Sequence, residues 1–140
     1  MATIREAQTQ VRQERGIKLI YVAGPMSGLP DHNFPAFRAC RDRLKAKGFG
    51  VMCPPDFPIN SDASRARQLA NHHYLRHDIE RLILCNGIAL LPGWEKSTGA
   101  RCEAAIMKTL GMHFYNELGE QIDTPAVISI TCGYTDGWEE

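Results

Sequence analysis

The chain has 140 residues, and its 16 Lys and Arg residues balance 16 Asp and Glu residues. This length fits one domain, and the charge balance excludes a global field that would draw the protein onto nucleic acid or an anionic membrane. No apolar run is long enough to cross a bilayer and residues 1–16 are polar, so we expect a soluble, cytoplasmic protein with an N-terminal extension (1–16) and one domain (17–140).

The first half of the chain predicts a strand, a helix and a second strand. Residues 17–23 (IKLIYVA) are a nearly continuous apolar run, which is typical of a strand buried on both faces. Residues 34–47 carry apolar side chains at helical spacing and are closed by Gly48, so they predict a helix. Residues 50–53 predict a short second strand, and residues 59–65 a loop or the start of the next helix.

The second half continues this alternation. Residues 66–84 predict an amphipathic helix, residues 88–91 a buried strand, and residues 98–110 a third helix. Residues 113–115 and 126–130 are the predicted fourth and fifth strands. The alternation predicts an α/β fold with an open, mostly parallel five-stranded sheet and helices on both faces, a three-layer sandwich of the flavodoxin or Rossmann type. In such a sheet, ligands bind beyond the carboxyl ends of the strands, where the strand order reverses.

Three junctions carry residues suited to ligand chemistry. Residues 23–28 (AGPMSG) let the backbone approach a phosphate or a sugar hydroxyl, although a plain turn fits equally well. Asp78, in the second helix, is an ordinary surface residue unless it has a partner. After the third strand, Ser97 or Thr98 can cap the third helix, and Glu103 falls in an early turn, where the helix dipole favours an ionised carboxylate. By spacing alone, a helix-stabilising glutamate is the simpler interpretation of Glu103.

The cysteines and histidines do not form a recognisable metal site. The five Cys residues are odd in number and widely spread, and they contain no C-x-x-C pair, which argues against a disulfide framework and a zinc cage. His73 and His77 lie one turn apart and, with His72 and Asp78, suggest a metal site, but no further ligand stands at metal spacing. We therefore expect neither a metal nor a cofactor.

Taken in order, these motifs resemble the nucleoside 2-deoxyribosyltransferase superfamily. The resemblance is to its branch of nucleoside 5′-monophosphate N-glycosidases and to related uncharacterised proteins of the DUF4406 type, and it runs from about Lys18 to Gly111. It rests on Tyr21-Val22-Ala23-Gly24 at the first strand, Asp78 before the third strand, and Ser97, Gly99 and Glu103 after it.

The resemblance implies a role for each matching residue. Glu103 corresponds to the nucleophile that attacks the anomeric carbon, Asp78 to the carboxyl that contacts and protonates the leaving base, and Tyr21 to the phenol that orients the nucleophile. Asn86, where many relatives carry an aspartate, and Trp94 are candidate base contacts, although Trp94 equally fits as a cover over the strand end. The residues expected to bind substrate and its 5′-phosphate are Gly24, Met26, Ser27, Gly28, Ser97 and Gly99.

The expected activity is hydrolysis of the N-glycosidic bond of a (deoxy)nucleoside 5′-monophosphate, which releases free base and (deoxy)ribose 5-phosphate. Residues 124–140 offer no counterpart of the Asn that a neighbouring subunit supplies in the transferase branch, which disfavours base exchange. The alternatives are a base-exchanging deoxyribosyltransferase and a non-catalytic nucleotide-binding module. The expected partner is a small nucleotide or nucleoside, not a nucleic acid polymer or a membrane, and the resemblance implies a homodimer or larger homo-oligomer.

Overall fold

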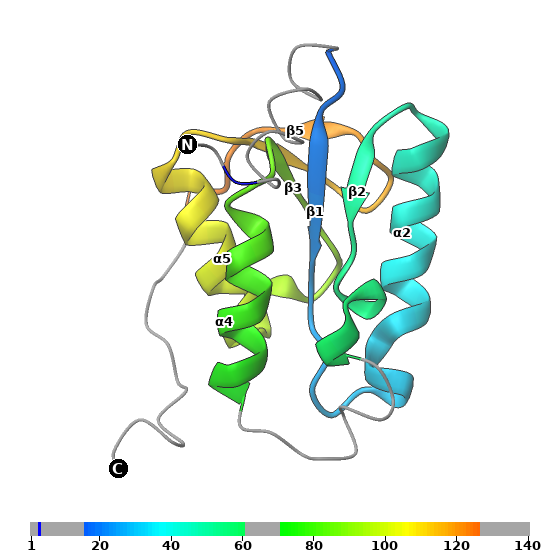
Figure 1. The fold of residues 1–140 in the computed structure, drawn as a ribbon, viewed down its shortest axis with the longest axis vertical. Helices are drawn as coiled ribbons and strands as arrows, with labels where there is room; N and C mark the ends of the chain where they lie inside the picture. Colours follow the sequence, from blue (N-terminus) through cyan, green and yellow to red (C-terminus); the bar gives the residue numbers. More distant parts are fainter. Residues whose placement is uncertain (1–2, 4–15, 61–70, 127–140) are drawn as a thin grey trace.

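Five strands form one sheet in the order β2-β1-β3-β4-β5 (Figure 1). The computed structural model of the protein describes residue 3 and residues 16–60 and 71–126. Within them β1, β2, β3 and β4 pair in parallel, and β5 runs antiparallel to β4. The strands are β1 (Leu19–Ala23), β2 (Gly50–Met52), β3 (Gly87–Leu90), β4 (His113–Tyr115) and β5 (Gln121–Ile122).

The strand order reverses at β1. From β1 the chain passes first to β2 on one side and then returns to β3 on the other, so Ile20 of β1 pairs with both Val51 and Gly87. In an open α/β sheet this reversal leaves a crevice at the carboxyl ends of the two central strands, because the connections leave on opposite faces. The ends of β1 and β3 are therefore where a ligand site is expected.

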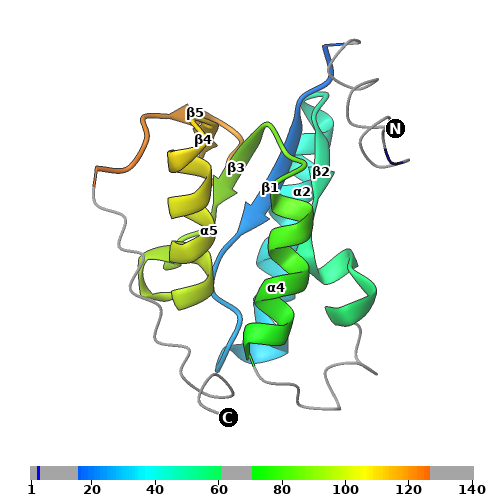
Figure 2. The ribbon, with the colours of Figure 1, turned by 60° about the vertical axis from the view of Figure 1, so that its left-hand side comes forward.

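Helices cover both faces of the sheet (Figures 1 and 2). Helix α2 (Phe34–Ala46) packs on one face, and α4 (Asn71–Leu82) and α5 (Thr98–Thr109) pack on the other. The alternation of side chains along β1 separates the two cores, since Ile20 and Val22 face α2 whereas Tyr21 and Ala23 face α4 and α5. All five residues of β1 are buried, as its unbroken apolar run predicted. None of the helices in the described residues has the length and hydropathy needed to span a membrane.

The predicted fold class is confirmed, and the fifth strand of the described sheet is a segment other than the predicted residues 126–130. The fifth strand is β5, which follows β4 through a tight turn closed by the hydrogen bond from Asn116 N to Glu120 O at 2.9 Å. The Asn116 side chain accepts from two backbone N–H groups of this turn, and Gly119 supplies the positive φ of 79° that it needs. Residues 127–130 of the predicted strand lie outside the described residues, as do residues 66–70 of the predicted second helix.

Candidate active site

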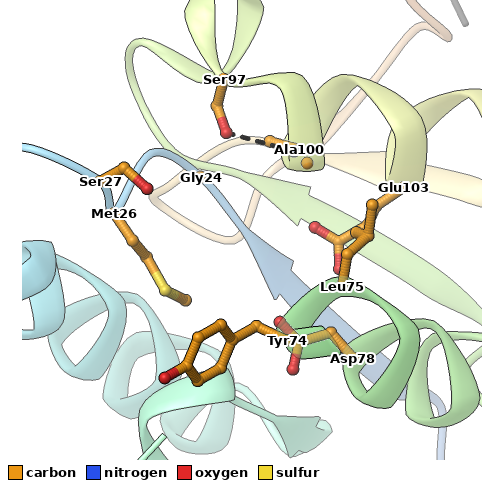
Figure 3. A pocket seen from close by; sticks show the side chains of 10 residues that line it. Gly24, Met26, Ser27, Tyr74, Leu75, Asp78, Ser97, Ala100 and Glu103 are labelled. Carbon is orange, nitrogen blue, oxygen red and sulfur yellow. Dashed lines mark hydrogen bonds between the residues drawn. The ribbon is translucent and has the colours of Figure 1, made fainter. Parts of the chain in front are cut away.

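A pocket opens at the carboxyl ends of β1 and β3, on the face covered by α4 and α5 (Figure 3). Three segments meet there: the loop after β1, one face of α4, and the first turns of α5. Its lining residues are Gly24, Met26, Ser27, Tyr74, Leu75, Asp78, Ser97, Gly99, Ala100 and Glu103. The pocket thus occupies the place where the strand order reverses.

Two carboxyl groups enter this pocket from different helices. Figure 3 shows Glu103 of α5 and Asp78 of α4 directed into the same space, and the two residues are only 5% and 7% exposed. Burial and then the charge of Asp78 raise the pKa of Glu103 well above its ordinary value. Two neighbouring buried carboxyls favour a state in which one is ionised and the other carries a proton. That state provides one nucleophile and one acid.

The ionisation of Glu103 is not governed by the helix dipole, contrary to our expectation from its position in the sequence. Helix α5 begins at Thr98, so Glu103 lies beyond the first turn, where the dipole and the free N–H groups act most strongly. Its buried position and its acidic neighbour have larger effects and raise its pKa. The ionised form of Glu103 therefore needs another source of stabilisation.

The hydroxyl of Tyr21 is one such source. Tyr21 lies in β1 beneath the pocket and is fully buried, and burial, Glu103 and Asp78 all raise its pKa, so the phenol stays protonated. As a hydrogen-bond donor it acts on Glu103 in the opposite direction and lowers the pKa of that carboxyl. The contact is loose, because neither Tyr21 Oη nor Glu103 Oε2 has a partner at good hydrogen-bonding geometry in the described part of the chain. Such contacts often tighten only when a substrate binds.

The start of α5 forms the part of the pocket suited to an anion. Ser97 is the N-cap, and its Oγ accepts from the N–H of Ala100 at 3.2 Å. Gly99 and Ala100 carry little or no side chain, which leaves the backbone of the first turn within reach of a ligand. The hydroxyls of Ser97 and Ser27 lie on the same side of the pocket, across from Tyr74 (Figure 3). Free N–H groups and hydroxyls at a helix start bind phosphate well.

Packing and hydrogen bonds fix the loop after β1. A Cβ on Gly24 would come within 2.7 Å of Leu91 Cβ, so only glycine lets this loop lie against the residue that follows β3. The side chain of Asn33 donates to Pro25 O at 3.0 Å from a turn in which residues 31–33 all have positive φ. Asp, His and Asn are the non-glycine residues that adopt left-handed backbone most readily. The loop that carries Met26 and Ser27 is thus held in place from both ends.

Three predicted binding residues do not line the pocket. Asn86 precedes β3 and lies at the opposite, amino edge of the sheet, where its Oδ1 accepts from Leu19 N at 2.9 Å. It does not line the pocket in which a base contact was expected, and its side chain instead holds the start of β1. Trp94 is half-buried against the core beneath α4 and α5, which fits its interpretation as a cover. Gly28 is exposed, with a φ of 77° and open space around it.

The structure adds Tyr74, Leu75 and Ala100 to the predicted set. Tyr74 and Leu75 precede Asp78 by four and three residues, so a helix places all three side chains on one face. This spacing is present in the sequence, but Tyr74 also fits the apolar face of the predicted amphipathic helix.

The suggested metal site finds no support on α4. His73 and His77 are both exposed there, whereas Asp78 turns into the pocket. Across residues 16–60 and 71–126, no group of three or more His, Cys, Asp or Glu side chains is arranged to hold a metal ion.

These features define a doubly wound α/β domain with a carboxyl-containing pocket at its topological switch point. The chain belongs to the DUF4406 family, a domain of unknown function, whose sequence model matches residues 18–116. That match includes every residue that lines the pocket. No curated protein matches the sequence.

Proposed function

We propose that this protein hydrolyses the N-glycosidic bond of a (deoxy)nucleoside 5′-monophosphate and releases free base and (deoxy)ribose 5-phosphate. One observation carries the proposal: the buried carboxyls of Glu103 and Asp78 share a pocket with the capped start of α5. A retaining glycosidase needs two such carboxyls, and a 5′-phosphate needs such an anion site. The resemblance of Tyr21, Asp78, Ser97 and Glu103 to the motifs of the nucleoside 2-deoxyribosyltransferase superfamily supports the same activity.

The reaction proceeds in two steps. The Glu103 carboxylate attacks C1′ of the sugar, the electron pair of the C1′–N bond leaves with the base, and Asp78 gives its proton to that base. Water then attacks C1′ of the glycosyl-enzyme ester, the ionised Asp78 takes a proton from this water, and Glu103 leaves as a carboxylate. Each carboxyl therefore returns to its starting state after one turnover.

The first step needs the shared proton on Asp78 and the negative charge on Glu103. Burial and Asp78 oppose that charge, since both raise the pKa of Glu103, while the Tyr21 hydroxyl favours it. Positive charge that develops on the sugar in the transition state adds an attraction for the Glu103 carboxylate. The site thus stabilises the ionised nucleophile most strongly at the point where the bond breaks.

The start of α5 is proposed to select monophosphates over nucleosides. Ser97, Ser27 and the backbone near Ala100 lie on one side of the pocket, and Asp78 lies on the other (Figure 3). A nucleotide bound across the pocket would set its phosphate at the helix start and its base beside Asp78. The sugar would then lie between them, against Glu103.

The test is incubation of the full chain with a panel of nucleoside and deoxynucleoside 5′-monophosphates and the matching nucleosides, with free base measured by chromatography. We expect base release from a monophosphate that Glu103→Gln abolishes. The exposed Glu95 lies on the neighbouring short helix η4 (Trp94–Lys96), and Glu95→Gln serves as the matched control that retains activity. Tight binding with no release from any substrate would instead indicate a non-catalytic nucleotide-binding module. Product formed only when a second free base is supplied would indicate a transferase.

A further inference from the structure

The buried side-chain amide of Asn60 lies within hydrogen-bonding distance of Asp78, the proposed acid. Asn60 ends the short helix η3 (Pro58–Asn60) in the connection after β2, and it is fully buried. Its Nδ2 lies 2.9 Å from the carbonyl oxygen of Pro54 and 3.5 Å from Oδ1 of Asp78. Asn60 is one of three buried polar or charged residues in the described part of the chain, and the other two are Asp78 and Glu103.

The Pro54 contact fixes which end of the Asn60 amide faces Asp78. A backbone carbonyl oxygen only accepts hydrogen bonds, so the amide atom 2.9 Å from it must be the NH2 nitrogen. That same nitrogen faces Asp78, and therefore Oδ1 of Asp78 is an acceptor. The carbonyl oxygen of a protonated carboxyl is a better acceptor than its hydroxyl oxygen, so the contact at Oδ1 favours a proton on the other oxygen, Oδ2.

The segment that presents Asn60 is rigid. Three of its residues are proline, and its short helices η2 (Pro54–Asp56) and η3 are closed by backbone hydrogen bonds from Phe57 N to Pro54 O and from Asn60 N to Phe57 O, both 2.9 Å long. The ring of Phe57 is buried and packs at 6.3 Å from the ring of Tyr21. The segment is thereby tied to the floor of the pocket.

We propose that Asn60 is a positioning residue for the reaction, which holds Oδ1 of Asp78 so that the proton on Oδ2 is delivered to the leaving base. This inference rests on the proposed function. Titratable groups that face Asp78 include Glu103 from α5 and Tyr21 from β1, and Tyr74 of α4 lines the same pocket. Asn60 differs from these groups in remaining neutral at every pH, so its hydrogen bond orients Asp78 without competing for the proton.

Kinetics of Asn60→Ala provide the first test. Loss of the donor removes one hydrogen bond that orients the Asp78 carboxyl, so kcat should fall about 10- to 100-fold while KM changes little. A hydrogen bond to a carboxylate favours the ionised form, and its loss should move the basic limb of the pH–rate profile about one unit higher. Asn86→Ala is the matched control, since it also removes a hydrogen-bonded side-chain amide, here a partly buried one at the opposite edge of the sheet. Asn86→Ala should lower the free energy of unfolding without shifting the basic limb of the pH–rate profile.

A second measurement separates this inference from the proposed activity. Carboxyl 13C NMR of the full-length protein follows the titration of Asp78 without any turnover, and its midpoint should rise in Asn60→Ala but not in Asn86→Ala. An unchanged midpoint in a folded Asn60→Ala protein would overturn the role of Asn60. If the wild-type protein released no base from any nucleotide, the proposed function would fail and this titration would still test the contact.

The wild-type protein offers a further measurement if Asn60→Ala does not fold. The side-chain amide protons of Asn60 should change chemical shift as Asp78 titrates, and this pH dependence should disappear in Asp78→Asn. Amide shifts that do not depend on pH, or that persist unchanged in Asp78→Asn, would overturn the inference.

Discussion

The phenol of Tyr21 lies beneath the carboxyl of Glu103, and each group alters the pKa of the other. Glu103 is the largest cause, after burial, of the raised pKa of Tyr21, whereas the donor hydroxyl lowers the pKa of Glu103. One residue comes from the central strand and the other from a helix packed on it. The pKa of Glu103, the proposed nucleophile, is therefore lowered by a hydroxyl from the strand beneath the pocket.

Tyr21→Phe should separate activity from stability. Without the hydroxyl, the pKa of Glu103 rises further, so the acidic limb of the pH–rate profile should move to higher pH and kcat at neutral pH should fall about tenfold or more. Because Tyr21 Oη has no partner at good hydrogen-bonding geometry within the described residues, its removal should not lower the free energy of unfolding at low pH, where Glu103 is protonated. Tyr115→Phe, in the buried core on the other face of the sheet, is the control. An unmoved limb in Tyr21→Phe would contradict this role.

Glu103→Gln should stabilise the protein increasingly as pH rises. The pKa of Glu103 in the folded state lies above its ordinary value of 4.5, so its contribution to stability is fully present below about pH 4.5 and is lost as pH rises through the folded pKa. Glutamine does not titrate and escapes this loss, which amounts to about 1.4 kcal/mol for each unit of pKa difference. Urea unfolding at several pH values measures the effect. A difference between the two proteins that does not grow with pH would contradict the raised pKa.

Substitutions of Ser97 should distinguish its capping role from phosphate binding. Ser97→Ala removes the acceptor for Ala100 N, which should cost about 1 kcal/mol and weaken monophosphate binding. Ser97→Asp keeps an N-cap acceptor, so its stability should stay near that of the wild type, but its charge should repel a phosphate and raise the Kd at least about tenfold. Thermal unfolding measures the stability of each variant, and calorimetric titration measures the Kd for a monophosphate and for its nucleoside. Equal binding of the monophosphate by Ser97→Asp and wild type would place the phosphate elsewhere.

Gly24→Ala should impair both folding and activity. The added Cβ would lie 2.7 Å from Leu91 Cβ, and such overpacking costs about 1–3 kcal/mol. The loop that carries Met26 and Ser27 would have to move, so base release should also fall. Gly28→Ala is the matched control, because its Cβ meets open space and its cost is only the strain of a positive φ, about 1–2 kcal/mol. Thermal unfolding and activity of the pair would refute this account if Gly28→Ala lost more activity than Gly24→Ala.

Asn86→Ala should lower stability and leave the chemistry intact. The change removes the acceptor for the buried N–H of Leu19, which should cost about 1–3 kcal/mol of unfolding free energy. Because Asn86 lies at the amino edge of the sheet, kcat/KM should remain within about twofold of the wild type. A large loss of kcat/KM in the folded variant would restore Asn86 as a candidate base contact.

The elements that could be predicted from sequence are those with a strong local pattern. The apolar runs of β1 and β3 and the helical spacing of α2 and α5 are local properties, so their positions were correct to within a residue or two. Strand β5 has only two residues and depends on the turn after Asn116, so the sequence shows no alternation of apolar and polar residues that would predict it. Asn86 is next to β3 in sequence but precedes it, and the direction of a parallel strand puts this residue at the amino edge, away from the pocket.

The sequence by itself determined the alternation of strands and helices, and with it the sheet, because hydrophobic periodicity and helix capping act over a few residues. It also placed Tyr21, Asp78, Ser97 and Glu103 on the segments that meet at one edge of that sheet. Only the tertiary structure decided that burial and Asp78 outweigh the helix position of Glu103, and that Asn60 reaches Asp78. A pKa and a hydrogen bond between distant segments depend on which side chains pack together and exclude water, and packing is settled only when the whole domain folds.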